Sequence, residues 1–168
     1  MKVLRILLGF IVSQAVGAPL EISGLNATAV TDVNMNLSAA EFRCHNDAYP
    51  NNIITFNFAR VLDNVQSFPD RETPGRSGYP HEFKNIQGIV WDFNTWRCSR
   101  SGYKPLLEMP VFPDGHLYPW DERRDSPNGQ NPGPARAIYA APGGTIEFCG
   151  LIAHVSGNQG YLEKCDVV

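Results

Sequence analysis

The sequence predicts an α+β fold with an antiparallel sheet. One amphipathic segment lies early in the chain, and a series of short apolar runs follows it. Such an order, one helix and then strands in series, is typical of α+β domains rather than of alternating βαβ units. The connectors between the apolar runs are rich in glycine and proline, and we find no internal repeats.

The helix is predicted over residues 55–67. Phe56, Ala59, Val61, Leu62 and Val65 follow the spacing of one helical face. Phe68-Pro69-Asp70 should end it. The strand-like runs cover residues 79–83, 88–93, 105–112, 135–141, 146–155 and 161–167. Pro142-Gly143-Gly144 is typical of a turn rather than of a phosphate-binding loop.

The N-terminal residues resemble a processing segment. Residues 1–18 have the pattern of a secretory signal peptide, with Lys2 and Arg5 before a short apolar stretch. Residues 19–43 are rich in Asn, Ala, Thr and Ser and predict a flexible extension or a propeptide, and residues 44–168 the folded domain. The extension carries two glycosylation sequons, at Asn26 and Asn36. We expect a secreted protein, and no later segment has the length and apolarity of a membrane span.

The net charge of the chain argues against non-specific electrostatic binding to nucleic acid. The formal net charge is −3, and loss of Lys2 and Arg5 with the signal takes it to −5. A protein that relies on non-specific phosphate contacts should be basic. Any contact with nucleic acid must therefore be local.

The chain has four cysteines, Cys44, Cys98, Cys149 and Cys165. In an exported chain an even count predicts two disulfides, and four cysteines allow three pairings. A zinc site is disfavoured because the chain has no Cys-x-x-Cys and no paired histidines at ligand spacing. We expect neither a metal nor another cofactor.

Three apolar runs each carry one ionisable residue. Glu108 lies in residues 106–112, Arg136 in residues 134–139, and His154 in residues 148–155. Taken singly, Glu108 and Arg136 would more often be structural partners and His154 a core histidine. Burying one unpartnered charge is costly, so we expect the three to meet in one place.

Tyr79-Pro80-His81 supplies two further polar rings. The residue before a proline is held extended, and strand side chains alternate, so Tyr79 and His81 should point the same way. Alone, the tripeptide would be a surface feature near a sheet edge. Together with the other three residues it fits RNA transesterification, which needs a base, an acid and positive charge.

Each of these side chains has an expected role in that reaction. Glu108 would remove the 2′-OH proton, and His154 would protonate the leaving 5′-oxygen. Arg136, Tyr79 and His81 would hold the phosphate oxygens. We expect Arg136 to keep Glu108 ionised and Glu108 to keep His154 protonated. Cys149, five residues before His154, should face the opposite side of a regular strand.

Several segments resemble known proteins. Ser77-Gly78-Tyr79-Pro80-His81-Glu82-Phe83 is similar to the Tyr-Pro-His segment of the fungal guanyl-specific ribonucleases. The later blocks resemble their ribotoxin branch, the α-sarcin, restrictocin and hirsutellin group. These blocks are Leu106-Leu107-Glu108-Met109-Pro110, Phe112-Pro113-Asp114-Gly115-His116, Asn131-Pro132-Gly133-Pro134-Ala135-Arg136, Phe148-Cys149-Gly150-Leu151-Ile152-Ala153-His154 and Asn158-Gln159-Gly160.

The resemblance implies more than the residues alone. It implies one helix packed on a twisted antiparallel sheet, the roles given above, and Leu162 as an apolar side chain against the scissile phosphate. It implies the disulfides Cys44–Cys165 and Cys98–Cys149. It also implies an endoribonuclease, acting as a monomer, that forms a 2′,3′-cyclic phosphate, and a ribotoxin that cleaves the sarcin–ricin loop of large-subunit ribosomal RNA.

Two features depart from the pattern of the family. The lysine-rich loop of ribotoxins is absent: the segment 84–104 is short and has only four basic residues. The guanyl-specific enzymes carry an acid where this chain has Gln87, and an amide offers one acceptor oxygen. Phe83, Asn85 and Gln87 remain the candidate base-binding residues, and a strict guanine preference does not follow from an amide at position 87. The alternative is a secreted ribonuclease-like effector that binds RNA or a host protein without catalysis.

Overall fold

The computed structural model describes residues 40–68, 70, 72–91, 96–99 and 105–168. The predicted signal peptide, both sequons and nearly all of the predicted extension lie outside these residues. None of the helices in the described part of the chain is long and apolar enough to cross a membrane.

A three-stranded antiparallel sheet joins the two ends of the domain. Its order is β2-β1-β8, from β1 (Glu41–His45), β2 (Ile53–Asn57) and β8 (Asp166–Val167). A single 3₁₀ turn, Pro50–Asn52, lies in the β1–β2 hairpin. The sequence did not indicate β1, which begins three residues before Cys44.

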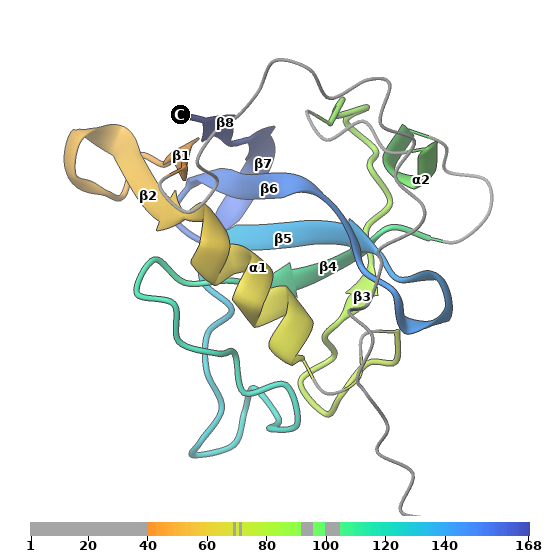
Figure 1. Ribbon diagram of the computed structural model, residues 1–168. Helices are drawn as coiled ribbons and strands as arrows, with labels where there is room; N and C mark the ends of the chain where they lie inside the picture. The colour runs from red at the N-terminus through yellow and green to blue at the C-terminus, as the bar shows by residue number, and fades with distance from the viewer. Residues whose placement is uncertain (1–39, 69, 71, 92–95, 100–104) are drawn as a thin grey trace, which may run out of the picture. The chain divides into compact units, whose positions relative to one another are not determined.

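A five-stranded antiparallel sheet forms the body of the domain (Figure 1). Its order is β3-β4-β5-β6-β7, and its strands are β3 (His81–Glu82), β4 (Leu107–Pro110), β5 (Ala135–Ala140), β6 (Glu147–Ser156) and β7 (Gln159–Lys164). A second 3₁₀ turn, Pro142–Gly144, connects β5 to β6, as the sequence predicts. The structure therefore confirms the α+β class.

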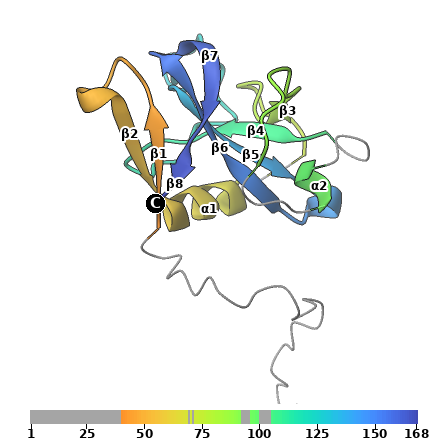
Figure 2. The same ribbon diagram turned by 90° about the horizontal axis from the view of Figure 1, so that it is seen from above.

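Helix α1 (Phe58–Ser67) lies across one face of this sheet in both views (Figures 1 and 2). It is three residues shorter than predicted, because Ile53–Asn57 forms β2. The side chain of Asn57 accepts a hydrogen bond from the Arg60 N–H and caps the first turn. Phe58, Val61 and Val65 are buried, which is the apolar face that the spacing predicts.

The strand predictions need three corrections. The run 79–83 forms only the two-residue β3, and the described part of 88–93 contains no strand. The run 161–167 divides at Cys165 into β7 and β8, which belong to different sheets. In each case the apolar pattern is present, but the residues pack as connectors or corners.

The main core fills the space between α1 and the sheet. Phe42 stacks on Phe58 with ring centroids 5.3 Å apart, and Phe148 meets Phe58 edge-on at 6.0 Å. Tyr139 and Leu151, on the sheet, are fully buried in the same cluster. A smaller cluster under the second helix, α2 (Trp96–Ser99), contains Phe83, Trp91, Cys98, Leu106, Ile138, Ala140, Cys149 and Ile152.

Two disulfides secure these layers, and both pairings agree with those implied by the resemblance. Cys44–Cys165 spans 121 residues and ties β1 to the end of β7. Cys98–Cys149 spans 51 residues and ties α2 to β6. In the chain-entropy model the first loop contributes about 5 kcal/mol and the second about 4 kcal/mol, as upper values. The two disulfides fit an extracellular protein.

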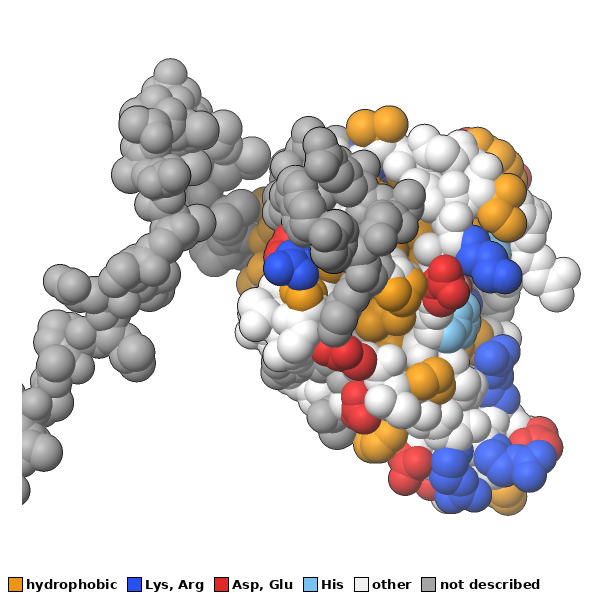
Figure 3. Space-filling model, turned by 90° about the vertical axis from the view of Figure 1, so that its right-hand side faces the viewer, with side chains coloured by type: hydrophobic (Ala, Val, Ile, Leu, Met, Phe, Trp, Pro, Cys, Tyr) orange, Lys and Arg blue, Asp and Glu red, His pale blue; other side chains and the backbone are white. Residues whose placement is uncertain are grey.

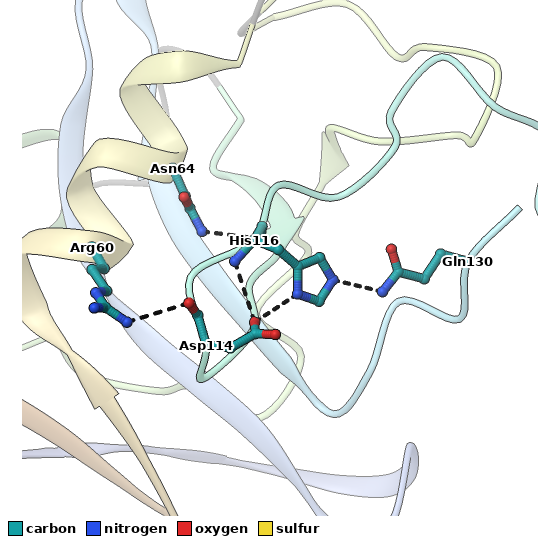
Figure 4. A network of polar contacts seen from close by, with 5 residues as sticks. All are labelled: Arg60, Asn64, Asp114, His116 and Gln130. Atoms are coloured by element: carbon teal, nitrogen blue, oxygen red, sulfur yellow. Dashed lines mark hydrogen bonds and ion pairs between the residues drawn. The ribbon is translucent and has the colours of Figure 1, made fainter. Parts of the chain in front are cut away.

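The long connection after β4 is tied to α1 by a polar network (Figure 4). His116 Nδ1 lies 2.6 Å from Asp114 Oδ1, and its Nε2 lies 2.6 Å from the Gln130 amide nitrogen. On the helix, Arg60 and Asn64 donate to the carbonyls of Asp114 and His116, at 3.3 and 3.4 Å. The network ties the connection between β4 and β5 to α1.

Candidate active site

Strands β4, β5 and β6 place Glu108, Arg136 and His154 on one face of the sheet. Glu108 pairs with Ile138, two residues from Arg136. Arg136 pairs in turn with Ile152, two residues from His154. Paired residues and residues two apart share a face of an antiparallel sheet. The predicted meeting of the three ionisable residues is therefore observed.

Glu108 lies against His81 on the edge strand β3. The two residues are paired in the sheet, and His81 Nδ1 is 3.2 Å from Glu108 Oε1. Burial raises the pKa of Glu108 above its ordinary value of 4.5, while the positive charges of His81 and Arg136 oppose that rise. We expected Arg136 to keep Glu108 ionised; its effect has that sign, but burial is the larger cause. A raised pKa suits a general base.

Tyr79 lies beside His81, as predicted. Their rings stack with centroids 4.6 Å apart and an interplanar angle of 27°. The backbone between the two residues contains a cis Tyr79–Pro80 peptide bond and does not continue as a regular strand. The guanidinium of Arg136 lies 5.5 Å from the centre of the Tyr79 ring. Tyr79 thus links the edge strand to Arg136.

Arg136 is a buried cation, with 5% of its surface exposed. Its Nη1 donates to three backbone carbonyls, those of Pro132, Gly133 and Ala135, at 2.8–2.9 Å. Gly133 adopts a left-handed conformation (φ 66°) in this turn, and its N–H donates to the Asn131 side chain. Neutral carbonyls hold the guanidinium without cancelling its charge, which leaves the positive field acting on the sheet face.

His154 lies at the other side of Arg136, at the end of β6. Its Nδ1 lies 3.1 Å from the Gly160 carbonyl oxygen. Because a carbonyl only accepts, Nδ1 carries a proton, and Nε2 is the nitrogen left for proton transfer. Leu162 is the paired residue on β7, so its apolar side chain shares the face.

The charge state of His154 differs from the expectation that Glu108 keeps it protonated. Burial lowers the pKa of His154 below its ordinary value of 6.5, and Arg136 lowers it further. The hydrogen bond to Gly160 acts in the opposite direction. The expectation was wrong because desolvation and the nearby guanidinium both oppose the imidazolium.

The prediction that Cys149 faces away from His154 was also wrong. Cys149 is buried in the same cluster as Ile138 and Ile152, which share the face of Arg136. The pairing register shifts here, with Ile138 opposite Gly150 and Tyr139 opposite Phe148. A bulge of this kind inserts one residue and re-aims the side chains before it. The Cys98–Cys149 disulfide therefore lies under the same face as the site.

The loop 83–89 carries the predicted base-binding residues, but two of them support the loop itself. Phe83 is buried and meets Trp91 edge-on at 5.9 Å. Asn85, in a left-handed conformation, donates to the Ile89 carbonyl at 3.0 Å and accepts from its N–H at 2.8 Å. Phe83 and Asn85 also line a hollow of about 260 Å³. Gln87 is exposed and is not among the lining residues of that hollow.

Arg124 is a neighbour of the site that the sequence reasoning missed. Its guanidinium lies 5.3 Å from the centre of the Tyr79 ring, and its Nε donates to the Ser77 carbonyl at 3.1 Å. Arg76, Arg123 and Arg124 line an open hollow of about 470 Å³. The sequence does mark this position, because Arg123 and Arg124 are the only two consecutive basic residues in the chain.

The basic side chains in view do not form a continuous surface. Figure 3 shows Lys and Arg in separate small groups, with carboxylates beside them. This distribution agrees with the acidic net charge and with local contacts to an anionic ligand. Among the described residues there is no group of three or more His, Cys, Asp or Glu that could hold a metal ion.

Comparison with known proteins places the chain in a family. A family model described as ribonuclease matches residues 37–166. The chain therefore belongs to the ribonuclease family.

The similar proteins within that family are ribotoxins and, more distantly, guanyl-specific ribonucleases. Ribonuclease mitogillin of Aspergillus fumigatus is 50% identical over 131 residues, which cover 67% of this chain and 72% of that protein. Ribonuclease clavin of Aspergillus clavatus is 32% identical over 168 residues, covering 82% and 92%.

A solved structure shares the fold. Restrictocin, an Aspergillus ribotoxin, superposes with a TM-score of 0.59 in its complex with a 29-mer sarcin/ricin domain RNA analogue. The two chains are 31% identical, and the match covers 74% of this chain and 98% of restrictocin.

Proposed function

We propose that this protein is a secreted endoribonuclease that cleaves RNA by transesterification without a metal cofactor. The observation that carries the proposal is the arrangement of Glu108 and His154 on either side of the buried Arg136 on one sheet face. A base and an acid on opposite sides of a cation fit an in-line displacement at phosphorus.

In the first half of the reaction Glu108 accepts the proton of the ribose 2′-OH. The 2′-oxygen then forms a bond to the adjacent phosphorus. Negative charge builds on the non-bridging oxygens, where Arg136, His81 and the Tyr79 hydroxyl stabilise it. The bond from phosphorus to the 5′-oxygen breaks, and His154 donates its Nε2 proton to that oxygen. The products are a 2′,3′-cyclic phosphate and a free 5′-OH.

The perturbed pKa values suit these two roles. Burial raises the pKa of Glu108, which makes its carboxylate a stronger base. Burial and Arg136 lower the pKa of His154, which makes its imidazolium a stronger acid. The base and acid are then both effective in a mildly acidic solution. Leu162 gives the leaving group an apolar neighbour, and we keep Phe83, Asn85 and Gln87 as the candidate base subsite.

The finer proposal is that the RNA is the sarcin–ricin loop of large ribosomal subunits. It is supported by the likeness to restrictocin, which was solved with an analogue of that RNA. The acidic net charge and the short 84–104 segment argue for a weaker general attraction to ribosomes than a basic protein would have. Recognition would then depend on local groups, among them the arginines beside Tyr79.

The proposal is tested with intact ribosomes and with free RNA, each treated with wild type, Glu108→Gln and His154→Gln. Glu163→Gln and His45→Gln are matched controls, since both side chains are about half exposed. One discrete fragment of large-subunit RNA supports a ribotoxin, whereas broad digestion of free RNA alone supports a general ribonuclease. RNA binding with no cleavage by wild type would favour the non-catalytic effector.

A further inference from the structure

Asn46, the residue that follows β1, is fully buried although it is polar. Its Nδ2 donates to the carbonyl oxygen of His154 at 2.6 Å and to that of Gly157 at 2.7 Å. Its Oδ1 accepts from the Ala48 N–H at 2.9 Å. A buried amide is costly unless its hydrogen bonds are made, and here both ends are satisfied.

The two carbonyls that accept from Asn46 lie at the end of β6 and in the turn that follows it, beside the proposed general acid His154. The β6–β7 pairing shifts register between His154 and Ser156, so the ladder is irregular at this point. Asn46 binds the His154 carbonyl at that irregularity, and the Asp47 N–H binds the Val155 carbonyl at 2.8 Å. The β1–β2 hairpin thus supplies contacts that the sheet itself lacks there.

The same turn returns to the imidazole. Gly157 is held by Asn46 at the start of the turn, and Gly160, three residues later, accepts the Nδ1 proton of His154. The position of the Gly160 carbonyl relative to the ring depends on the shape of residues 156–160. Asn46 fixes both the backbone that carries the ring and the turn that orients it.

We propose that Asn46 is a positioning residue for His154, which holds the β6–β7 turn so that Gly160 binds Nδ1 and Nε2 faces the reacting phosphate. This inference rests on the proposed function. Asn46 would touch neither the RNA nor the reacting atoms. Its effect would pass through two backbone carbonyls and one side-chain hydrogen bond.

A purely structural role for Asn46 is the alternative. Strand β1 is held independently by the Cys44–Cys165 disulfide and by pairing with β2 and β8. Loss of the Asn46 side chain should therefore leave the hairpin in place and loosen the turn after His154. The titratable and charged side chains on the elements around His154 are those of His45, Asp47, Glu108, Arg136, Glu163 and Lys164, and every variant compared retains them.

The test compares Asn46→Ala and Asn46→Asp with Asn64→Ala. Asn64 is also a buried asparagine, and it donates one long hydrogen bond to a carbonyl remote from β6. Cleavage of a short RNA should show kcat lowered about tenfold or more in both Asn46 variants, with KM nearly unchanged, because misplacement of a reacting group costs rate. Asn64→Ala should keep the wild-type kcat.

The titration of His154, followed by nuclear magnetic resonance, distinguishes a positioning role of Asn46 from a purely structural one. In Asn46→Ala, which adds no charge, the titration of His154 should shift to lower pH, because the Gly160 hydrogen bond that favours the imidazolium is weakened. In the wild type, the side-chain amide of Asn46 should change its chemical shift with the same midpoint as His154. This second measurement needs no variant and holds even where a substitution prevents folding.

Folded Asn46 variants with wild-type kcat and wild-type His154 titration would overturn the proposal. The proposal would also be overturned if, in the wild type, the chemical shift of the Asn46 side-chain amide did not change as His154 titrates. Full activity of His154→Gln has a different meaning, because it would refute the proposed function while leaving the coupling between Asn46 and His154 measurable.

Discussion

The carboxylate of Glu108 lies 3.2 Å from Nδ1 of His81, on the neighbouring edge strand, and burial still raises its pKa. An attractive contact at this distance would by itself lower the pKa of a carboxyl group. The contact acts in that direction, but desolvation of Glu108 on β4 is the larger effect, and the pKa is raised. That combination, a buried base with a polar neighbour, is the basis of the predictions that follow.

Replacing Glu108 with Gln should lower kcat on RNA by about 10²–10⁴-fold, the usual contribution of a general base. The amide keeps the shape and can still accept from His81, so the variant should fold. Because the raised pKa means that ionised Glu108 costs stability above pH 4.5, its melting temperature at neutral pH should equal or exceed that of the wild type. Steady-state kinetics tests the first statement, which an unaltered kcat would contradict, and thermal unfolding tests the second, which a lower melting temperature would contradict.

The pH dependence of kcat/KM should be bell-shaped and narrow. Glu108 must be ionised, and its raised pKa places the acid limb above 4.5. His154 must be protonated, and its lowered pKa places the alkaline limb below 6.5. The optimum therefore lies between these values. A rate that still increases above pH 6.5 would assign the acid to another group.

Arg136→Lys should lower kcat about 100-fold or more. One ammonium cannot both satisfy the carbonyls of Pro132, Gly133 and Ala135 and reach a phosphate oxygen as the guanidinium does. Arg123→Lys, at an exposed site whose side chain is 63% accessible, is the matched control and should retain activity. Because lysine keeps the positive charge, equal losses in the two variants would contradict a specific role for the guanidinium of Arg136.

Asn85 should matter for stability. Asn85→Ala removes two hydrogen bonds to Ile89 and leaves a left-handed residue with a Cβ, so we expect a loss of about 2–3 kcal/mol in the free energy of unfolding. Asn85→Gly loses the same hydrogen bonds without the backbone cost and should lose less. Urea denaturation distinguishes the two variants, and the reverse order would refute the explanation.

The loop network of Figure 4 predicts an acid-sensitive contact. Hydrogen bonds from the His116 side chain and N–H hold the pKa of Asp114 below its ordinary value of 3.8. A lowered native pKa stabilises the fold above 3.8, and the contribution is lost as the pH falls through the native value. Asp114→Asn should therefore show a shallower fall in melting temperature below pH 4, whereas an unchanged slope would show that the contact has no role.

Much of this molecule follows from local sequence patterns. The apolar runs around Glu108, Arg136 and His154 are strands, and the cost of burying an unpartnered charge correctly predicts that the three side chains meet. The start of the predicted helix was wrong because residues 55–57 continue the strand that begins at Ile53 and pair with β1. Gly150 lies beside the bulge at Cys149, and a glycine inside a strand often marks a bulge, but the sequence does not say which side chains the bulge re-aims.

The supports of the site could not be predicted in the same way. Arg136 is held by carbonyls, and every residue has one, so no side chain marks the contact. Asn46 reaches His154 across 108 positions, a contact that depends on the tertiary fold. The direction of the His154 pKa shift depends on burial, which a list of nearby charges does not reveal.

The central claim is that Glu108 and His154 carry out transesterification on this sheet face. The most direct measurement is the chemical nature of the 3′ ends formed when the purified protein cleaves a short RNA in the presence of a chelator. We expect 2′,3′-cyclic phosphates with the wild type, and little or no cleavage with Glu108→Gln or His154→Gln. Cleavage by the wild type that leaves 3′-hydroxyl ends, or that stops when the chelator is added, would contradict the account.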